Sequence, residues 1–183
     1  FPTSADLGIR ALLLAFFSGI TLGIVSALNR GKWLDYACII IAILGVSLPD
    51  FIMGYLLQFV FGLKLKLLPI ALWKGFKFTV LPTFALSFYT TALLTRIMRA
   101  SMLDVVNQDF IKVAKAKGLS TFQIVWRHQI RNAILPVVTI LGPITAAILT
   151  GTFVIESIYA IPGMGKYYVL GIQNLDYSQI LGL

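Results

Sequence analysis

Long uncharged stretches alternate with short polar segments along this chain. Residues 11–29, 78–95 and 132–155 carry no charged side chain, and residues 36–63 carry only Asp50. Each stretch can cross a bilayer, which needs about 20 mostly apolar residues. None shows the two-residue alternation of a membrane β-strand, so helices are favoured. The pattern predicts an all-α, polytopic transmembrane domain with four complete spans, at about residues 9–29, 36–62, 78–97 and 133–155.

The polar segments between these spans predict the remaining organisation. Residues 98–132 form a long loop, residues 156–178 form a re-entrant loop on the opposite side, and residues 179–183 begin a last span. The chain opens on Phe1 and ends inside an apolar stretch. We therefore expect a fragment of a longer membrane protein, with further helices beyond its ends.

Composition and charge agree with a membrane protein and set its orientation. Hydrophobic residues make up 58% and charged residues 12% of the chain, and the mean hydropathy of +0.90 excludes an ordinary soluble domain. The net charge is +8, but the basic residues lie between apolar spans and do not form a stripe interleaved with exposed aromatic residues. Nucleic acid is therefore not expected as a partner. Most lysines and arginines fall in residues 29–32 and 96–131, which predicts that these loops are cytoplasmic.

The long loop contains signals for two short helices. Asp109 can cap the start of a helix that runs to Lys117, and Gly118 follows as a left-handed C-terminal stop. Ser120 and Gln123 have the spacing of a capping box, which predicts a second helix that continues toward Pro136. Two interpretations stay open here: a hairpin that lies on lipid headgroups, and a surface that receives another protein.

Two stretches of this loop carry a family resemblance. Residues 114–119 read Ala-Lys-Ala-Lys-Gly-Leu, and residues 126–136 read Trp-Arg-His-Gln-Ile-Arg-Asn-Ala-Ile-Leu-Pro. Together they resemble the cytoplasmic signature of ABC importer permeases, and more narrowly the dipeptide and oligopeptide permease family. Residues 29–35 and 156–165 are similar to the same family. Of the three residues that lead the general importer signature, only Ala114 matches.

The resemblance implies a type I ABC importer in a bacterial or archaeal cell membrane. This subunit would form a path for di- or oligopeptides, pair with a second permease in a heterodimer, contact membrane lipid, and receive substrate from an extracytoplasmic binding protein. Two cytoplasmic ATPases would use ATP and Mg, because this chain shows no Gly-Lys-Ser or Gly-Lys-Thr phosphate loop. The permease itself would bind no cofactor and would not be an enzyme. A nickel or glutathione permease, or a secondary transporter, are the alternatives.

The resemblance also assigns residues to the contact with the ATPase. Most lie on the helix before the glycine turn, and the expected contact residues are Phe110, Val113, Ala114, Lys115, Ala116, Lys117, Gly118 and Leu119.

A second group of residues is expected at the translocation path or its external gate. Asp50 follows Pro49 near the middle of a span, where a carboxylate is costly unless it is paired or wetted. It either lines the path, near a cationic group of the peptide, or is a protonated or hydrogen-bonded structural acid. By analogy with the family, the gate includes Glu156, Pro162, Gly163, Met164 and Gly165. A plain turn that ends a helix is the alternative.

Two further residues predict no chemistry of their own. His128 has no serine or cysteine nucleophile with a positioned acid in its loop, so a structural role is expected. Cys38 is the single cysteine and lies inside a span, so it predicts neither a disulfide nor a metal site.

Overall fold

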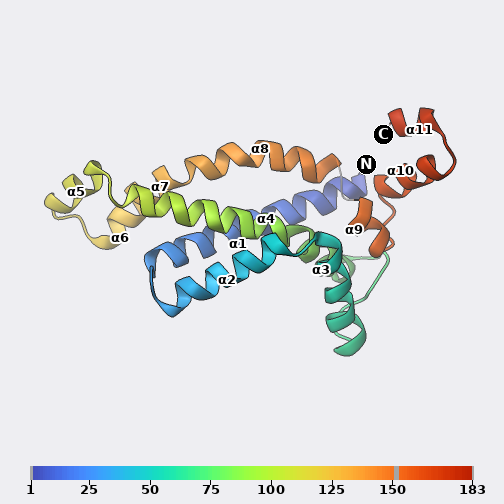
Figure 1. Ribbon diagram of the computed structural model, residues 1–183, viewed down its shortest axis with the longest axis horizontal. Helices are drawn as coiled ribbons and strands as arrows, with labels where there is room; N and C mark the ends of the chain where they lie inside the picture. The colour runs from blue at the N-terminus through green and yellow to red at the C-terminus, as the bar shows by residue number, and fades with distance from the viewer. Residues whose placement is uncertain (1, 151–152, 183) are drawn as a thin grey trace. The chain divides into compact units, whose positions relative to one another are not determined.

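The computed structural model describes residues 2–150 and 153–182, and those residues form helices joined by loops, with no strand (Figure 1). The predicted all-α class is confirmed. The helices in chain order are α1 (Pro2–Leu28), α2 (Trp33–Ser47), α3 (Asp50–Leu57), the π-helix η1 (Gln58–Lys64), α4 (Phe76–Val105), α5 (Asp109–Ala116), α6 (Thr121–Gln123), the π-helix η2 (Ile124–Gln129), α7 (Ile130–Ala133), α8 (Leu135–Thr150), α9 (Phe153–Ile158), α10 (Met164–Gln173) and α11 (Tyr177–Gly182).

The chain divides into two compact units. Residues 15–47 and 90–144 form one, which we call the hairpin unit, and residues 1–14, 48–89 and 145–183 form the other, which we call the three-segment unit. Among the described residues, α1 and α4 are long and apolar enough to cross a membrane. The count rises to four if the interrupted pairs α2 to η1 and α6 to α8 are each one span.

The stretch expected as one span over residues 36–62 is two α-helices and a π-helix. α2 ends at Ser47, and Pro49 stands at the N-terminus of α3 with φ −59° and ψ 144°. A proline restricts the residue before it to extended conformations and has no N–H for a helical hydrogen bond, so Leu48 leaves the helical conformation and α2 ends at Ser47. The stretch expected as residues 133–155 is α8 and the start of α9, and its residues 151 and 152 lie outside the described part of the chain.

Two glycines set the distance between α1 and α4 in the hairpin unit. A Cβ atom on Gly19 would lie 2.7 Å from the Cβ of Leu94. A Cβ on Gly23 would lie 2.6 Å from the Cβ of Met98 and 2.9 Å from the carbonyl oxygen of Thr95. Small residues four apart on one helix face let two backbones approach closely, which is a common packing device of membrane helices.

A buried apolar cluster continues from this contact. Leu94, Met98 and Met102 of α4 pack with Ala133 of α7 and Val137 of α8, and each is at most 2% exposed. Cys38 on α2 is also buried, as expected for a cysteine that serves as a small apolar residue. The core of this unit is therefore built around one face of α4.

A buried ion pair joins the first turn of α2 to α4. Nε and Nη2 of Arg99 donate to the two carboxylate oxygens of Asp35 at 2.7 and 2.9 Å. The Asp35 carboxylate also accepts from the hydroxyl of Ser26 and from the backbone N–H of Gly31, the latter at 2.9 Å. Asp35 is only 2% exposed. We call these four residues the Asp35 clamp, because one carboxylate holds α1, the turn and α4 together.

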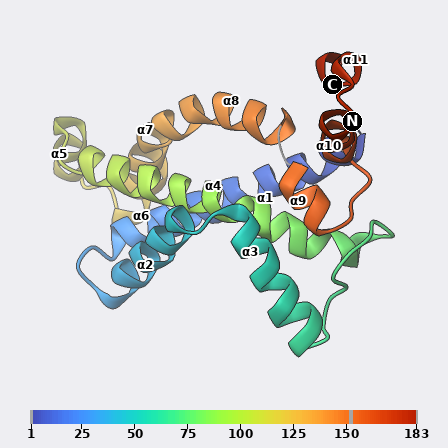
Figure 2. The ribbon, with the colours of Figure 1, turned by 45° about the vertical axis from the view of Figure 1, so that its right-hand side comes forward.

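The three-segment unit is held by hydrogen bonds between side chains and distant backbone groups. The Tyr159 hydroxyl donates to the carbonyl oxygen of Gly54 at 2.9 Å, and Nε2 of Gln58 donates to the carbonyl oxygens of Ile70 and Ile158 at 2.7 and 2.9 Å. The backbone N–H of Leu72 donates to the Tyr159 carbonyl oxygen at 2.9 Å. These bonds fasten α3, which lies beside α9 in Figures 1 and 2, to the loop before α4.

Gly23→Leu should destabilise the hairpin unit. The new side chain has no room against Met98 and the Thr95 carbonyl, and overpacking of this kind costs about 1–3 kcal/mol. Reaction of Cys38 with a thiol-reactive dye during heating of the purified protein measures the effect. Gly142→Leu is the matched control, because a Cβ at Gly142 meets nothing within 4 Å. An equal shift in both variants would contradict the packing argument.

Asp35→Asn should destabilise the protein by about 3 kcal/mol, because it leaves the Arg99 guanidinium largely desolvated without a counter-charge. The same Cys38 assay measures this. The double variant Asp35→Asn with Arg99→Gln should recover part of the loss, since no uncompensated charge remains. If the double variant is as unstable as the sum of the single variants, the ion pair is not what holds the turn.

Candidate functional site

The hairpin of α5, Gly118 and α6 contains the residues that the family resemblance assigns to the contact with the ATPase. Gly118 has φ +76°, in the left-handed region that favours glycine. Its N–H donates to the Lys115 carbonyl oxygen at 3.0 Å, and the Leu119 N–H donates to the Ala114 carbonyl oxygen at 3.3 Å. This bonding pattern is the Schellman motif, which satisfies the last carbonyl groups of α5. The predicted glycine stop is confirmed.

The start of α6 also agrees with the sequence, whereas the start of α5 does not. Ser120 and Gln123 form the expected capping box, with the Ser120 hydroxyl accepting from the Gln123 N–H and the Gln123 side chain accepting from the Ser120 N–H. At α5 the capping position belongs to Gln108, which makes no side-chain cap bond. The expectation that Asp109 caps α5 is wrong, since Asp109 lies inside the first turn and pairs with Lys112 at 2.8 Å.

One face of α5 is buried against the second arm of the hairpin. Ile111 is 0% exposed and Ala114 is 4% exposed, and both pack against Ile124. Val105 and Leu119 close the edges of this small core. Ala114 is therefore an internal packing residue, so its burial does not fit its place among the residues expected to contact the ATPase directly.

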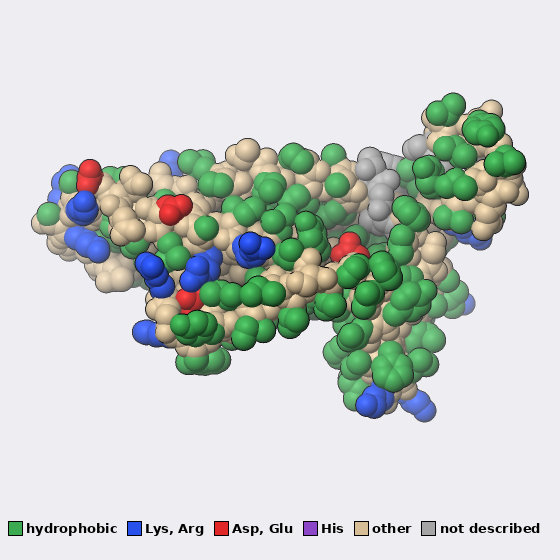
Figure 3. All heavy atoms as spheres, in the orientation of Figure 1, with side chains coloured by type: hydrophobic (Ala, Val, Ile, Leu, Met, Phe, Trp, Pro, Cys, Tyr) green, Lys and Arg blue, Asp and Glu red, His purple; other side chains and the backbone are tan. Residues whose placement is uncertain are grey.

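The opposite side of α5 is exposed and partly apolar. Phe110 is 41% exposed and Val113 is 52% exposed, and Lys117 follows on the same side of the helix by its spacing. Of the remaining expected contact residues, Lys115, Ala116 and Gly118 are also exposed, and Leu119 is half-buried. Figure 3 shows Lys and Arg side chains gathered over α4, α5 and the turn between α1 and α2. The hairpin thus presents apolar groups within a basic surface.

The second arm returns through η2 and α7 toward α8. The rings of Phe122 and Trp126 lie 6.1 Å apart between centroids, and their side chains are 71% and 58% exposed. The Asn132 side chain donates to the His128 carbonyl oxygen at 2.7 Å. His128 is half-buried, and its side chain forms no hydrogen bond or ion pair with the described residues.

The expected path residues Pro49 and Asp50 lie at the start of α3. Asp50 occupies the first turn, where the exposed N–H groups and the helix dipole favour a negative charge. Its side chain is half-buried and forms no ion pair or hydrogen bond within the described residues. Within the described part of the chain, the carboxylate therefore has the start of its own helix beside it and no side-chain partner.

The expected gate residues form a compact turn between α9 and α10. The Glu156 carboxylate is 2% exposed and accepts from the Gly165 N–H at 2.7 Å, so it satisfies the start of α10. Cβ atoms on Gly163 and Gly165 would clash with Glu156, and at Gly165 also with the backbone of Phe153. The Met164 N–H donates to the Ser4 hydroxyl at 2.9 Å. Pro162 is exposed, whereas the glycines make room for a buried acid.

Two sets of residues that position the α5 hairpin were not predicted from the sequence. The first is the Asp35 clamp, although an acid at the end of an apolar span, with an arginine at the end of another, is a signal for pairing. The second is Gly19 and Gly23, which have the small-residue spacing of a close helix contact. Within the described ranges, no group of three or more His, Cys, Asp or Glu side chains is placed to hold a metal ion.

Comparison with known proteins supplies the family. Over 182 residues the chain is 50% identical to the dipeptide transport system permease protein DppB of Bacillus subtilis (strain 168). The alignment covers 100% of this chain and 59% of that protein. Over 185 residues it is 43% identical to the oligopeptide transport system permease protein OppB of Salmonella typhimurium, with 100% and 60% covered. The chain thus spans about three fifths of the length of these curated relatives.

A solved structure supports the fold. The crystal structure of an amino acid ABC transporter with histidines contains a chain with a TM-score of 0.71 and 14% identity, and the match covers 99% of this chain and 80% of that one. Residues 19–183 match the family described as binding-protein-dependent transport system inner membrane component. Because this match takes in most of the sequence, the chain belongs to that family of inner membrane transport components.

Proposed function

We propose that this chain is part of a permease subunit that forms the translocation path of an ATP-driven importer for di- or oligopeptides. The observation that carries the proposal is the 50% and 43% identity, over the whole chain, to permease proteins of dipeptide and oligopeptide transport systems. Peptides are accordingly the substrate class that the comparisons support, ahead of nickel or glutathione.

The partners follow from the same family. The permease pairs with a second, similar permease, binds two cytoplasmic ATPases that use ATP and Mg, and takes substrate from an extracytoplasmic binding protein. The cell membrane is the expected location. The basic residues around α5 and the α1–α2 turn support a cytoplasmic position for these two segments, by the positive-inside rule.

We assign the ATPase contact to the exposed side of α5. Phe110 and Val113 place apolar surface on a short helix whose other side is already packed against Ile124. An exposed apolar side chain in a basic loop is suited to a groove on another protein. Gly118 and Ala114 act indirectly in this assignment, since the first forms the turn and the second packs the hairpin that holds α5 in place.

Asp50 is the residue that we assign to the path. Its half-buried carboxylate at the start of α3, which has no ion-pair partner among the described residues, suits a cationic group of a passing peptide, such as an amino terminus or a lysine side chain. Glu156 and the 162–165 turn support the path indirectly, because the buried hydrogen bond to Gly165 fixes the loop between α9 and α10.

Val113→Glu should uncouple the ATPase from transport. The side chain is 52% exposed, so α5 folds as before, but a charge now stands where apolar contact with the ATPase is expected. Substrate-stimulated ATPase activity of the assembled transporter should fall about tenfold or more, the effect of losing roughly 1.4 kcal/mol of contact energy. The control is Lys112→Glu, on the other flank of α5. Stimulation at the wild-type level in Val113→Glu would reject the assignment of this side.

Asp50→Asn should slow the uptake of peptides that carry an additional cationic side chain more than the uptake of neutral peptides. The amide keeps the size of the group but removes the charge that attracts the cation. Uptake of matched labelled peptides by proteoliposomes measures the ratio. Asp6→Asn, which removes a carboxylate already paired with Arg10 on the surface of α1, is the control. Unchanged uptake of every peptide would remove Asp50 from the path.

A further inference from the structure

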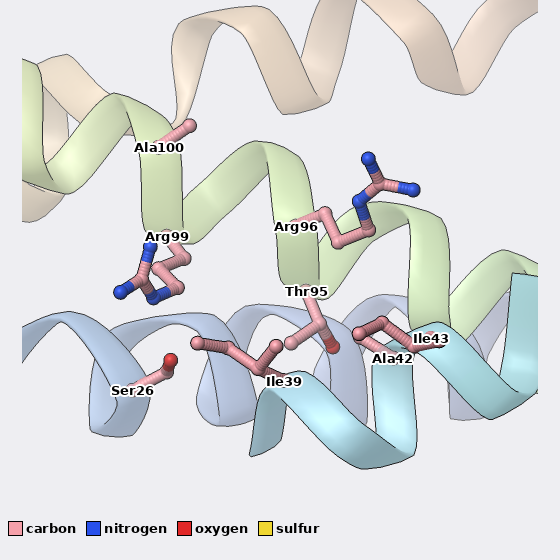
Figure 4. A pocket seen from close by; sticks show the side chains of 8 residues that line it. All are labelled: Ser26, Ile39, Ala42, Ile43, Thr95, Arg96, Arg99 and Ala100. Atoms are coloured by element: carbon pink, nitrogen blue, oxygen red, sulfur yellow. The ribbon is translucent and has the colours of Figure 1, made fainter. Parts of the chain in front are cut away.

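A hollow in the hairpin unit combines basic and apolar walls. Its volume is about 430 Å³. The lining residues come from α1, α2 and α4, and they are Ser26, Ile39, Ala42, Ile43, Thr95, Arg96, Arg99 and Ala100. Figure 4 shows that Arg99 extends from α4 toward α1, while Arg96 extends along α4 and Ile39, Ala42 and Ile43 lie on α2. The hollow therefore has a polar side on α4 and an apolar side on α2.

The charge on its polar side is not neutralised within the unit. Arg99 is balanced by Asp35, through the bidentate contact of the clamp. Arg96 lies about one helical turn before Arg99 on α4, is exposed, and forms no ion pair within the described residues. A positive charge thus remains at the hollow. An anionic group bound there would meet the guanidinium of Arg96, while the charges of Asp35 and Arg99 beside it cancel.

The apolar side of the hollow continues onto the exposed apolar face of α2, which is suited to contact with hydrocarbon. Ile40, Ile43 and Leu44 of α2 are 57%, 53% and 50% exposed. The hollow lies next to the α1–α2 turn, where an apolar span meets the basic residues Arg30 and Lys32. A ligand with an anionic group at one end and hydrocarbon at the other fits this order of surfaces. A free inorganic anion would leave the α2 wall uncovered.

We propose that this hollow binds one anionic phospholipid, with the phosphate at Arg96 and the acyl chains along Ile43 and Leu44, which lead away from the α1–α2 turn. Basic hollows between membrane helices at the cytoplasmic surface are sites for anionic lipid headgroups. The site is separate from the α5 hairpin and from Asp50, so it goes beyond the proposed transport function. An acidic segment of the second permease is the competing occupant, and the experiment below separates the two.

Arg96→Gln tests the charge. The complete transporter is reconstituted in nanodiscs of phosphatidylethanolamine with a minority of phosphatidylglycerol, extracted into mild detergent, and analysed for retained lipid by native mass spectrometry. Wild type should retain phosphatidylglycerol in preference to phosphatidylethanolamine, and Arg96→Gln should lower that preference about fivefold, as for one arginine at a membrane surface. Arg127→Gln, which removes an exposed arginine outside the hollow, should retain the wild-type preference.

Ala100→Phe tests the shape, because it fills the hollow from an exposed position and keeps both arginines. It should lower phosphatidylglycerol retention as well. Equal retention in wild type and Arg96→Gln, or an equal loss in Arg127→Gln, would overturn the site.

A photo-crosslinking amino acid at Ile43 identifies the occupant in the intact transporter. A lipid adduct on this chain supports the proposal, and a cross-link to the second permease overturns it. Because neither readout depends on peptide uptake or ATP hydrolysis, failure of the lipid site and failure of the proposed transport function can be told apart.

Discussion

The buried carboxylate of Asp35 is the constraint on which the hairpin unit depends. It accepts hydrogen bonds from Ser26, Gly31 and Arg99, which belong to α1, the following turn and α4. A charge buried to this degree is tolerated only with a close partner, so the ends of three segments must meet at one point. The close packing of Gly19 and Gly23 on α4 continues from there along the helices.

This fixed frame would let the proposed ATPase contact on α5 act on the helices that flank the hairpin. α4 leads directly to α5, and the small core of Ile111, Ala114 and Ile124 joins α5 to the arm that returns to α8. A force on the exposed side of α5 would therefore be passed to two helices through packed side chains. A flexible loop of the same composition would absorb it.

The three-segment unit is held together differently, because it contains loops with little regular structure, such as residues 65–75. It does so with side chains that reach backbone groups far away in sequence, such as Tyr159 to Gly54 and Gln58 to Ile158. Glu156 has the same function for α10, and Gly163 and Gly165 leave the space that its carboxylate needs. Asp50 differs from these residues, since its side chain forms no such bond within the described part of the chain.

The sequence by itself determined the helical class, the Gly118 turn and the capping box of α6. These features depend on uncharged runs or on residues within one helical turn, so their physical cause is contained in a short stretch. Only the tertiary structure decided that Ala114 is buried while Val113 is exposed, that Glu156 caps α10, and that Asp35 pairs with Arg99, which is 64 positions away. Such choices depend on which distant surfaces come into contact, and no local pattern specifies them.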